Sequence, residues 1–190
     1  MIFSSIEFII FFILFKILIG IFNKHQKLII VSSSLFFYTY WNPIFIFLIL
    51  FLCSTTYLLI KNKINLKFSI MIVLLPLFYF KYSFFVFSFI SLDFFNYFSY
   101  TGDLPLAISF ITFTAVAILI DTRNKTFDNK LTFIDFSEFI LYFPQLIAGP
   151  ILRAKDLIPQ LKNKIFLKKE NIKFGIFLFS IGFIKKVFLA

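Results

Sequence analysis

The sequence TFIDFSEFILYFPQLIAGPI, which occupies positions 132–151, decides the fold of this chain. It is apolar enough to enter a membrane, but Pro144 interrupts its helical pattern and Gly149-Pro150 closes it. Proline removes a backbone amide, so main-chain carbonyls lose their helical donors inside an apolar sequence. Such a backbone is tolerated at membrane depth only where protein or a water-filled cavity satisfies it. The stretch therefore predicts a re-entrant element rather than a spanning helix.

Polar residues inside this stretch carry two further signals. Thr132 and Asp135 have the spacing of a capping box, in which each side chain satisfies a free amide at a helix start. Gln145 follows Pro144 directly, and its side chain can donate a hydrogen bond to a carbonyl that the proline leaves free. We expect a helix to begin at Thr132 and Gln145 to stabilise the break, with lining of a passage as the alternative role.

The composition of the whole chain points to a membrane protein. Of its 190 residues, 61% are apolar and 34 are Phe, against roughly 45–50% apolar residues in soluble proteins. The net charge is +10, but Lys and Arg punctuate apolar runs instead of clustering on a polar face, which excludes a nucleic-acid partner. The single cysteine, Cys53, excludes an intrachain disulfide or a cysteine metal site.

The chain is expected to be all-α, with about five transmembrane helices. A crossing needs ~20 residues, and the candidate stretches are 2–22, 28–41, 44–60, 68–92 and 104–120. The second has only 14 apolar residues and is joined to the third by Asn42-Pro43, a helix cap with a first-turn proline. The fourth is predicted to bend at Pro76, and the fifth to start with Asp103 as its cap.

The distribution of charge sets the topology. Basic residues follow the first, third and fifth stretches, whereas 93–103 holds two acids and no base. The positive-inside rule then places the basic loops in the cytosol and the N-terminus outside, as in a multi-pass protein of the inner (cytoplasmic) membrane. Splitting 68–92 at Lys81 would give two short spans and would break this alternation.

These observations divide a single membrane domain, 1–190, into three parts. Residues 1–131 hold the five spans, 132–173 form the re-entrant element and a basic cytosolic region, and 174–190 start a further helix that is lateral or incomplete. Seven bases between Arg153 and Lys173 are expected to face the anionic headgroups of the lipid bilayer.

Several motifs resemble the membrane-bound O-acyltransferase family, in its bacterial branch of alginate and peptidoglycan acyltransferases. They occur in family order along nearly the whole chain: 40–43, 104–110 through 121, 143–151 with Arg153, 159–161 and 182–187. The resemblance assigns Phe143, Pro144, Gln145, Gly149, Pro150 and Arg153 to the family signature beside an acyl-donor tunnel.

The resemblance implies transfer of an acyl group, expected to be acetyl, to a cell-envelope polysaccharide outside the membrane. The donor would be acetyl-coenzyme A or an acyl carrier, used as a substrate, with no resident cofactor and no metal. Arg153 could grip a phosphate of that donor, with contact to a lipid headgroup as the alternative. A periplasmic acyltransferase is a possible partner.

The family's catalytic histidine lies in a carboxy-terminal half that this sequence does not contain. The only histidine, His25, lies in a Lys-rich turn without a family motif, so we expect it to be structural or interfacial. The sequence stops at Ala190 within a matched element, so the chain is expected to be an amino-terminal part that is inactive without its missing half. The alternative is a non-catalytic scaffold or partner-binding subunit of an acylation complex. A transporter fragment would need an internal repeat, and we find none.

Overall fold

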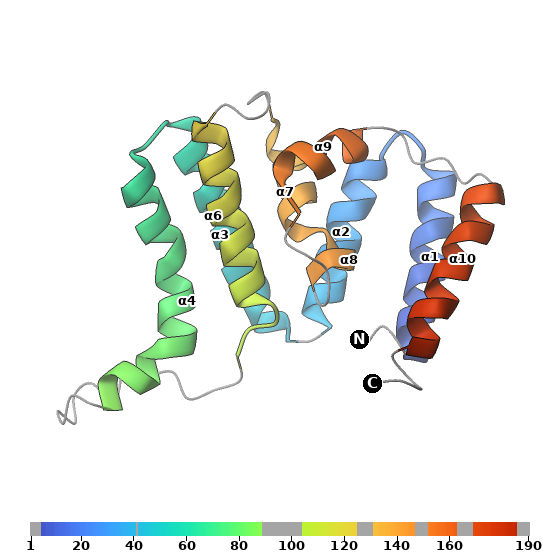
Figure 1. Cartoon of the computed structure of the whole chain (residues 1–190), viewed down its shortest axis with the longest axis horizontal. Helices are drawn as coiled ribbons and strands as arrows, with labels where there is room; N and C mark the ends of the chain where they lie inside the picture. The colour runs from blue at the N-terminus through green and yellow to red at the C-terminus, as the bar shows by residue number, and fades with distance from the viewer. Residues whose placement is uncertain are drawn as a thin grey trace.

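A computed structural model describes residues 5–40, 42–88, 104–124, 131–146, 152–162 and 169–185. These residues form helices joined by turns, with no strand among them (Figure 1). The elements are α1 (Ile6–Ile21), α2 (Gln26–Thr39), the single 3₁₀ turn η1 (Pro43–Phe45), α3 (Ile46–Lys61), α4 (Leu66–Ser88), α6 (Ile108–Arg123), α7 (Phe133–Leu141), α8 (Phe143–Leu146), α9 (Ala154–Lys162) and α10 (Lys169–Ile184). The prediction of an all-α chain is confirmed for this part of the sequence.

Two helical stretches in the described ranges are long and apolar enough to cross a membrane. They are Pro43–Lys61, with 19 residues, and Leu66–Ser83, with 18 residues. The helices α1, α2 and α6 have 16, 14 and 16 residues, which at ~1.5 Å per residue is less than the ~30 Å hydrocarbon core. The expected count of five spans therefore stays a prediction.

The hairpin between α2 and α3 forms as its sequence predicts. The Asn42 side chain accepts a hydrogen bond from the Ile44 amide at 3.0 Å, and Pro43 occupies the first position of η1. Proline is favoured there because the first helical amide has no partner to lose. The cap and the proline together turn the chain sharply from one helix into the next.

The helix α4 runs without interruption from Leu66 to Ser88 and contains Pro76, and Figure 1 shows that it bends along its length. It continues past Lys81, so the described part shows one helix rather than two. The Lys81 side chain is exposed, and its ammonium lies 5.6 Å from the centre of the Tyr82 ring. An amphipathic stem with its charge held over an aromatic ring suits a position close to a membrane interface.

The start predicted for the fifth stretch is wrong by four residues. The helix α6 begins at Ile108, whereas the sequence pattern placed its first residue at Leu104. Ala107 adopts a left-handed conformation, with φ of 54°, which cannot lie inside a right-handed helix. The Ile108 amide donates instead to the carbonyl of Pro105 in a turn. The proposed cap, Asp103, lies outside the described residues.

The helix α7 lies at the centre of the fold, packed against α2, α3, α6 and α9. All of its residues from Asp135 to Leu141 are buried. Near its amino-terminal end, the Lys27 ammonium pairs with the Asp135 carboxylate, and the Arg123 guanidinium donates to the Ile64 carbonyl between α3 and α4. These contacts gather the basic connections at one end of the molecule, the upper end in Figure 1.

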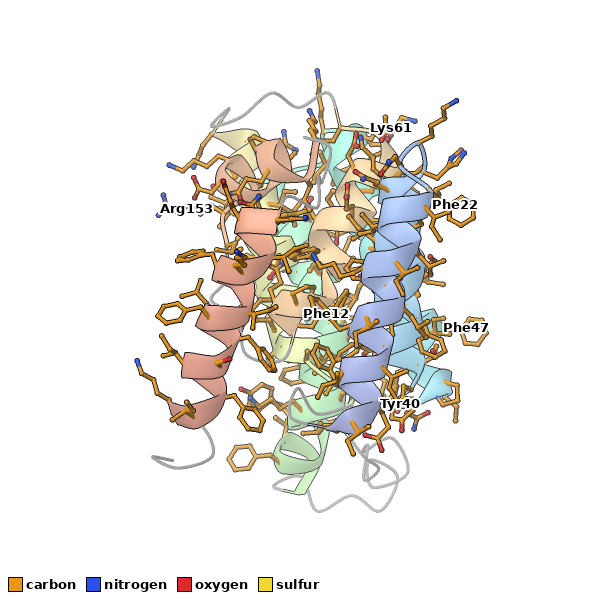
Figure 2. The ribbon with its side chains drawn as sticks, turned by 90° about the vertical axis from the view of Figure 1, so that its right-hand side faces the viewer. Phe12, Phe22, Tyr40, Phe47, Lys61 and Arg153 are labelled. Carbon is orange, nitrogen blue, oxygen red and sulfur yellow. The ribbon has the colours of Figure 1, made fainter. Side chains whose placement is uncertain are left out.

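Side chains on the outside of the bundle also differ between its two ends. Figure 2 shows Lys61 and Arg153 towards one end and Tyr40 towards the other, with Phe22 and Phe47 projecting outward. The helix α10 starts five residues earlier than the predicted stretch 174–184, and all of its residues are exposed. It lies on the same side of the molecule as α1 in Figure 1, apart from α1 in Figure 2, and runs roughly along the other helices.

Candidate functional site

The helical path from α7 into α8 is broken at Tyr142. The chain leaves α7 after Leu141, Tyr142 has a ψ of 99°, and the short helix Phe143–Leu146 follows. If α7 continued, the ring of Pro144 would clash with the carbonyl of Ile140 and would offer that carbonyl no amide. Breaking two residues earlier places Pro144 in the first turn of a new helix, where its missing amide costs little.

Side chains take over the hydrogen bonds that the break releases. The Phe143 amide would donate to the Phe139 carbonyl in a continuous helix, but it donates to the Ser34 hydroxyl of α2 at 3.3 Å. The freed Phe139 carbonyl accepts from the Gln145 side-chain amide at 3.1 Å. The predicted structural role of Gln145 is thus seen in the geometry, with the acceptor set by the break rather than by the missing proline amide.

The Phe143 ring holds the broken segment against two other helices. It is fully buried, with its centre 5.1 Å from Phe15 and 5.2 Å from Phe11 of α1, both edge-on, and 5.6 Å from Phe37 of α2. Edge-to-face aromatic pairs at such separations add to the stability gained from burial. Phe143 therefore anchors α8, and its side chain is part of the packed core.

The other signature residues are distributed differently. Gly149 and Pro150 lie outside the described residues. Arg153 is exposed just before α9, and its carbonyl accepts the amides of Asp156 and Leu157 at 3.0 and 3.2 Å. The structure thus brings Phe143, Pro144 and Gln145 together at the break, whereas the phosphate contact expected of the Arg153 side chain stays a prediction.

The start of α7 forms the predicted capping box. The Thr132 hydroxyl accepts from the Asp135 amide at 3.2 Å, and the Asp135 carboxylate accepts from the Thr132 amide at 3.2 Å. Burial alone would raise the pKa of Asp135, but hydrogen bonds from Lys27 and Thr132 and the charge of Lys27 lower it below its ordinary value. The carboxylate is therefore charged at neutral pH and ties α7 to α2.

The relatives of the chain decide its family. A peptidoglycan O-acetyltransferase of Helicobacter pylori is 32% identical over 201 residues, which cover 86% of this chain and 38% of that protein. A probable alginate O-acetylase AlgI of Pseudomonas syringae pv. tomato is 29% identical over 100% of this chain and 40% of its own length. The chain belongs to the membrane-bound O-acyltransferase family.

The predicted family is therefore confirmed. Its acyltransferase members are membrane proteins, in keeping with the two described helices that are long and apolar enough to cross a membrane. A probable alginate O-acetylase AlgI of Pseudomonas putida is 41% identical over 87 residues, which cover 46% of the chain. The chain spans about two fifths of the length of the Helicobacter and Pseudomonas syringae proteins. No family model and no solved structure matches it.

Sequence reasoning missed one residue of this segment, Glu138. Its side chain is 1% exposed, and its Oε1 atom has no hydrogen-bond partner within the described ranges. Burial raises the pKa of Glu138 to about 7, with Lys27 acting in the opposite direction and Asp135 in the same one. A carboxyl group in an apolar run was the available signal, because such a group is costly to bury unless it has a role.

Buried polar atoms without a partner among the described residues lie near the break. Besides Glu138, the Oε1 atom of Gln145 is buried without a partner in the described part of the structure. Both belong to the segment for which a family signature is predicted, and α7, with nine residues, is too short to span a membrane. No group of three or more metal-binding side chains occurs among the residues that the structure describes.

Proposed function

We propose that this chain is the amino-terminal part of a membrane O-acetyltransferase that acts on a cell-envelope polysaccharide. The observation that carries the proposal is the likeness along the whole chain to proteins named peptidoglycan O-acetyltransferase and alginate O-acetylase. The two names describe O-acetylation, of peptidoglycan in one case and of alginate in the other. The broken segment at Tyr142–Gln145 adds support, because it puts polar main chain within an apolar sequence.

The chain would act together with a further part that carries the catalytic base. Its one histidine, His25, lies in the turn between α1 and α2, away from the break in α7. Residues 1–190 would thus be inactive alone and would supply the binding side of a passage for the acyl donor. The donor would be acetyl-coenzyme A or an acyl carrier, and a periplasmic acyltransferase would be a candidate partner.

Each signature residue has a proposed task. Phe143 and Pro144 fix the shape of the break, and Gln145 satisfies the freed carbonyl of Phe139. Gly149 and Pro150 would close the re-entrant segment, and Arg153 would contact a phosphate of the donor at the cytosolic surface. The topology proposed with this function is a multi-pass protein of the inner membrane with about five spans and its basic loops in the cytosol.

A chimera tests this function. Residues 1–190 would replace the matched amino-terminal part of the Helicobacter pylori peptidoglycan O-acetyltransferase, in a strain that lacks the native protein. Acetyl released by mild alkali from purified peptidoglycan would be measured. We expect the chimera to restore acetylation, and residues 1–190 alone to leave the peptidoglycan unacetylated.

A second chimera distinguishes a wrong functional proposal from a poor fit between the two joined proteins. Residues 1–190 would replace the matched part of the Pseudomonas syringae alginate O-acetylase, and acetyl on alginate would be measured. Failure of both chimeras, each present in the membrane at the level of the native protein, would contradict the proposed function. Acetylation by residues 1–190 alone would contradict the need for a further part.

A further inference from the structure

A hollow of about 400 Å³ lies at the basic end of the molecule, where the turn between α1 and α2 meets the start of α7 and the end of α9. We name it the basic hollow, because the four ionisable residues in the described part of its lining are bases: Lys24, His25, Lys27 and Lys162. Its size falls in the range of small-molecule sites, which are roughly 300–1,000 Å³. Of the predicted signature residues that the structure describes, none lines it: Phe143, Pro144, Gln145 and Arg153 all lie elsewhere.

Among the residues that the structure describes, an ion pair compensates only part of the charge of the basic hollow. Lys27 pairs with Asp135, so its charge is compensated. Lys24 and Lys162 are exposed, and they approach the hollow from different elements, the α1–α2 turn and the last turn of α9. Lys162 also offsets the negative end of the α9 dipole, which would otherwise disfavour an anion.

The start of α7 adds to the attraction for an anion. Thr132 and Ile134 both line the basic hollow, so the amino-terminal end of α7 faces it. The partial positive charge of a helix amino terminus attracts anions at close range. Asp135 in the first turn reduces this effect, although the pair with Lys27 compensates its charge.

The turn that presents Lys24 is ordered by its own hydrogen bonds. The Gln26 side chain donates to the Asn23 side-chain oxygen at 3.3 Å, and the His25 amide donates to the Phe22 carbonyl at 2.9 Å. A site held on an ordered turn loses less conformational entropy on binding than one on a loose loop. His25 lines the hollow itself, and its backbone hydrogen bond fixes the turn beside Lys24.

Apolar side chains complete the lining and indicate an organic phosphate. Leu28, Ile134 and Leu161 contribute to the wall beside the bases. We propose that the basic hollow binds a phosphate ester at the cytosolic face. The phosphate would come from the nucleotide end of the acyl donor, a choice that rests on the proposed function, or from the headgroup of an anionic lipid.

The test uses the full chain in nanodiscs of neutral phosphatidylcholine. Adenosine 3′,5′-bisphosphate serves as the soluble phosphate probe, and its binding is measured by titration calorimetry. The rates at which an amine-reactive reagent labels Lys24 and Lys162 are followed by mass spectrometry. A second set of nanodiscs contains phosphatidylglycerol and no nucleotide, which isolates the lipid source.

The double variant K24Q/K162Q removes the two available charges, and K155Q is its matched control. Lys155 is an exposed base of α9 that does not line the basic hollow. We expect nucleotide or anionic lipid to slow labelling of Lys24 and Lys162 but not of Lys155. For the nucleotide, K24Q/K162Q should weaken binding by about tenfold or more while K155Q leaves it unchanged.

The outcomes assign the source or overturn the site. If only the nucleotide slows labelling, the soluble donor is the source of the phosphate. If only phosphatidylglycerol slows it, the lipid headgroup is the source. If both slow it, the hollow recognises the phosphate chemistry that they share. No slowing in either set, or nucleotide binding that K24Q/K162Q does not weaken, overturns the proposal. Acetylation by a chimera that carries K24Q/K162Q, at the rate of the unchanged chimera, would reject the hollow as a donor site and leave the proposed function standing.

Discussion

Replacing the buried acid Glu138 with glutamine should make the chain more stable at neutral and alkaline pH. The side chain is 1% exposed, and burial raises the pKa of Glu138 to about 7 from an ordinary value of 4.5. The folded protein therefore holds a proton that the unfolded chain releases. The free energy of unfolding falls as the pH rises through this interval, because charging the buried carboxyl group then opposes folding.

The size of the effect follows from that pKa. Between pH 4.5 and 7 the folded state keeps a proton that the unfolded state has lost, so the free energy of unfolding falls by about 1.4 kcal/mol per pH unit. Glu138 therefore removes roughly 3 kcal/mol of stability between acid and mildly alkaline pH. E138Q keeps the shape of the side chain and cannot ionise. Its free energy of unfolding should lack this decline. Asp135 does not confuse the measurement, because its lowered pKa puts its own loss of stability below that interval.

SDS-induced unfolding in mixed micelles at pH 5 and pH 8 measures this difference. The matched control is E170Q, which removes an acid from the exposed first turn of α10. We expect wild-type protein and E170Q to lose stability between the two pH values, and E138Q to lose roughly 2.5 kcal/mol less, because part of the change already lies below pH 5. Equal losses in E138Q and wild-type protein would refute the reasoning, as would a wild-type protein that gains stability on going to pH 8.

Three further predictions follow from other contacts. S34A removes the hydroxyl that accepts the Phe143 amide at the helix break, and it should lower the free energy of unfolding by about 1–3 kcal/mol in the same assay. The control S32A alters an exposed hydroxyl of the same helix and should change the free energy of unfolding little. D135N removes one charge of the ion pair and should cost about 1 kcal/mol at pH 7; because the pKa of Asp135 is lowered, the difference from wild type should shrink as the pH falls below 4, and a constant difference would contradict this. In a C53S background, I44C and K67C should react with an impermeant thiol reagent from opposite sides of the membrane, and reaction from one side would reject the proposed topology.

Local signals in the sequence predicted the helix starts that depend on neighbouring residues. The capping box at Thr132 and Asp135 and the cap at Asn42 are confirmed, because each needs only side chains within three positions of the amide that it satisfies. The start of α6 was missed because the left-handed conformation of Ala107 has no signal in an alanine side chain. A turn that tertiary packing imposes cannot be identified from local preference.

The helix break shows where local reasoning stops. Pro144 predicts that the helix breaks. The position of the break at Tyr142 depends on Ser34, whose hydroxyl accepts the Phe143 amide from 109 positions earlier in the chain. The choice of the Phe139 carbonyl as the acceptor for Gln145 follows from that long-range bond. The basic hollow escaped prediction for the same reason, because its lining joins three segments that only the folded chain brings together.

Acetylation by a chimera with a straightened helix tests most directly whether the break at Tyr142 is needed for acyl transfer. The chimera with the Helicobacter pylori protein would carry P144A, which restores the missing amide, and S34A, which removes the outside acceptor of the Phe143 amide. At equal abundance in the membrane, the account predicts alkali-labile acetyl on peptidoglycan with the native break and its loss in the P144A/S34A chimera. Equal acetylation by both chimeras would contradict it.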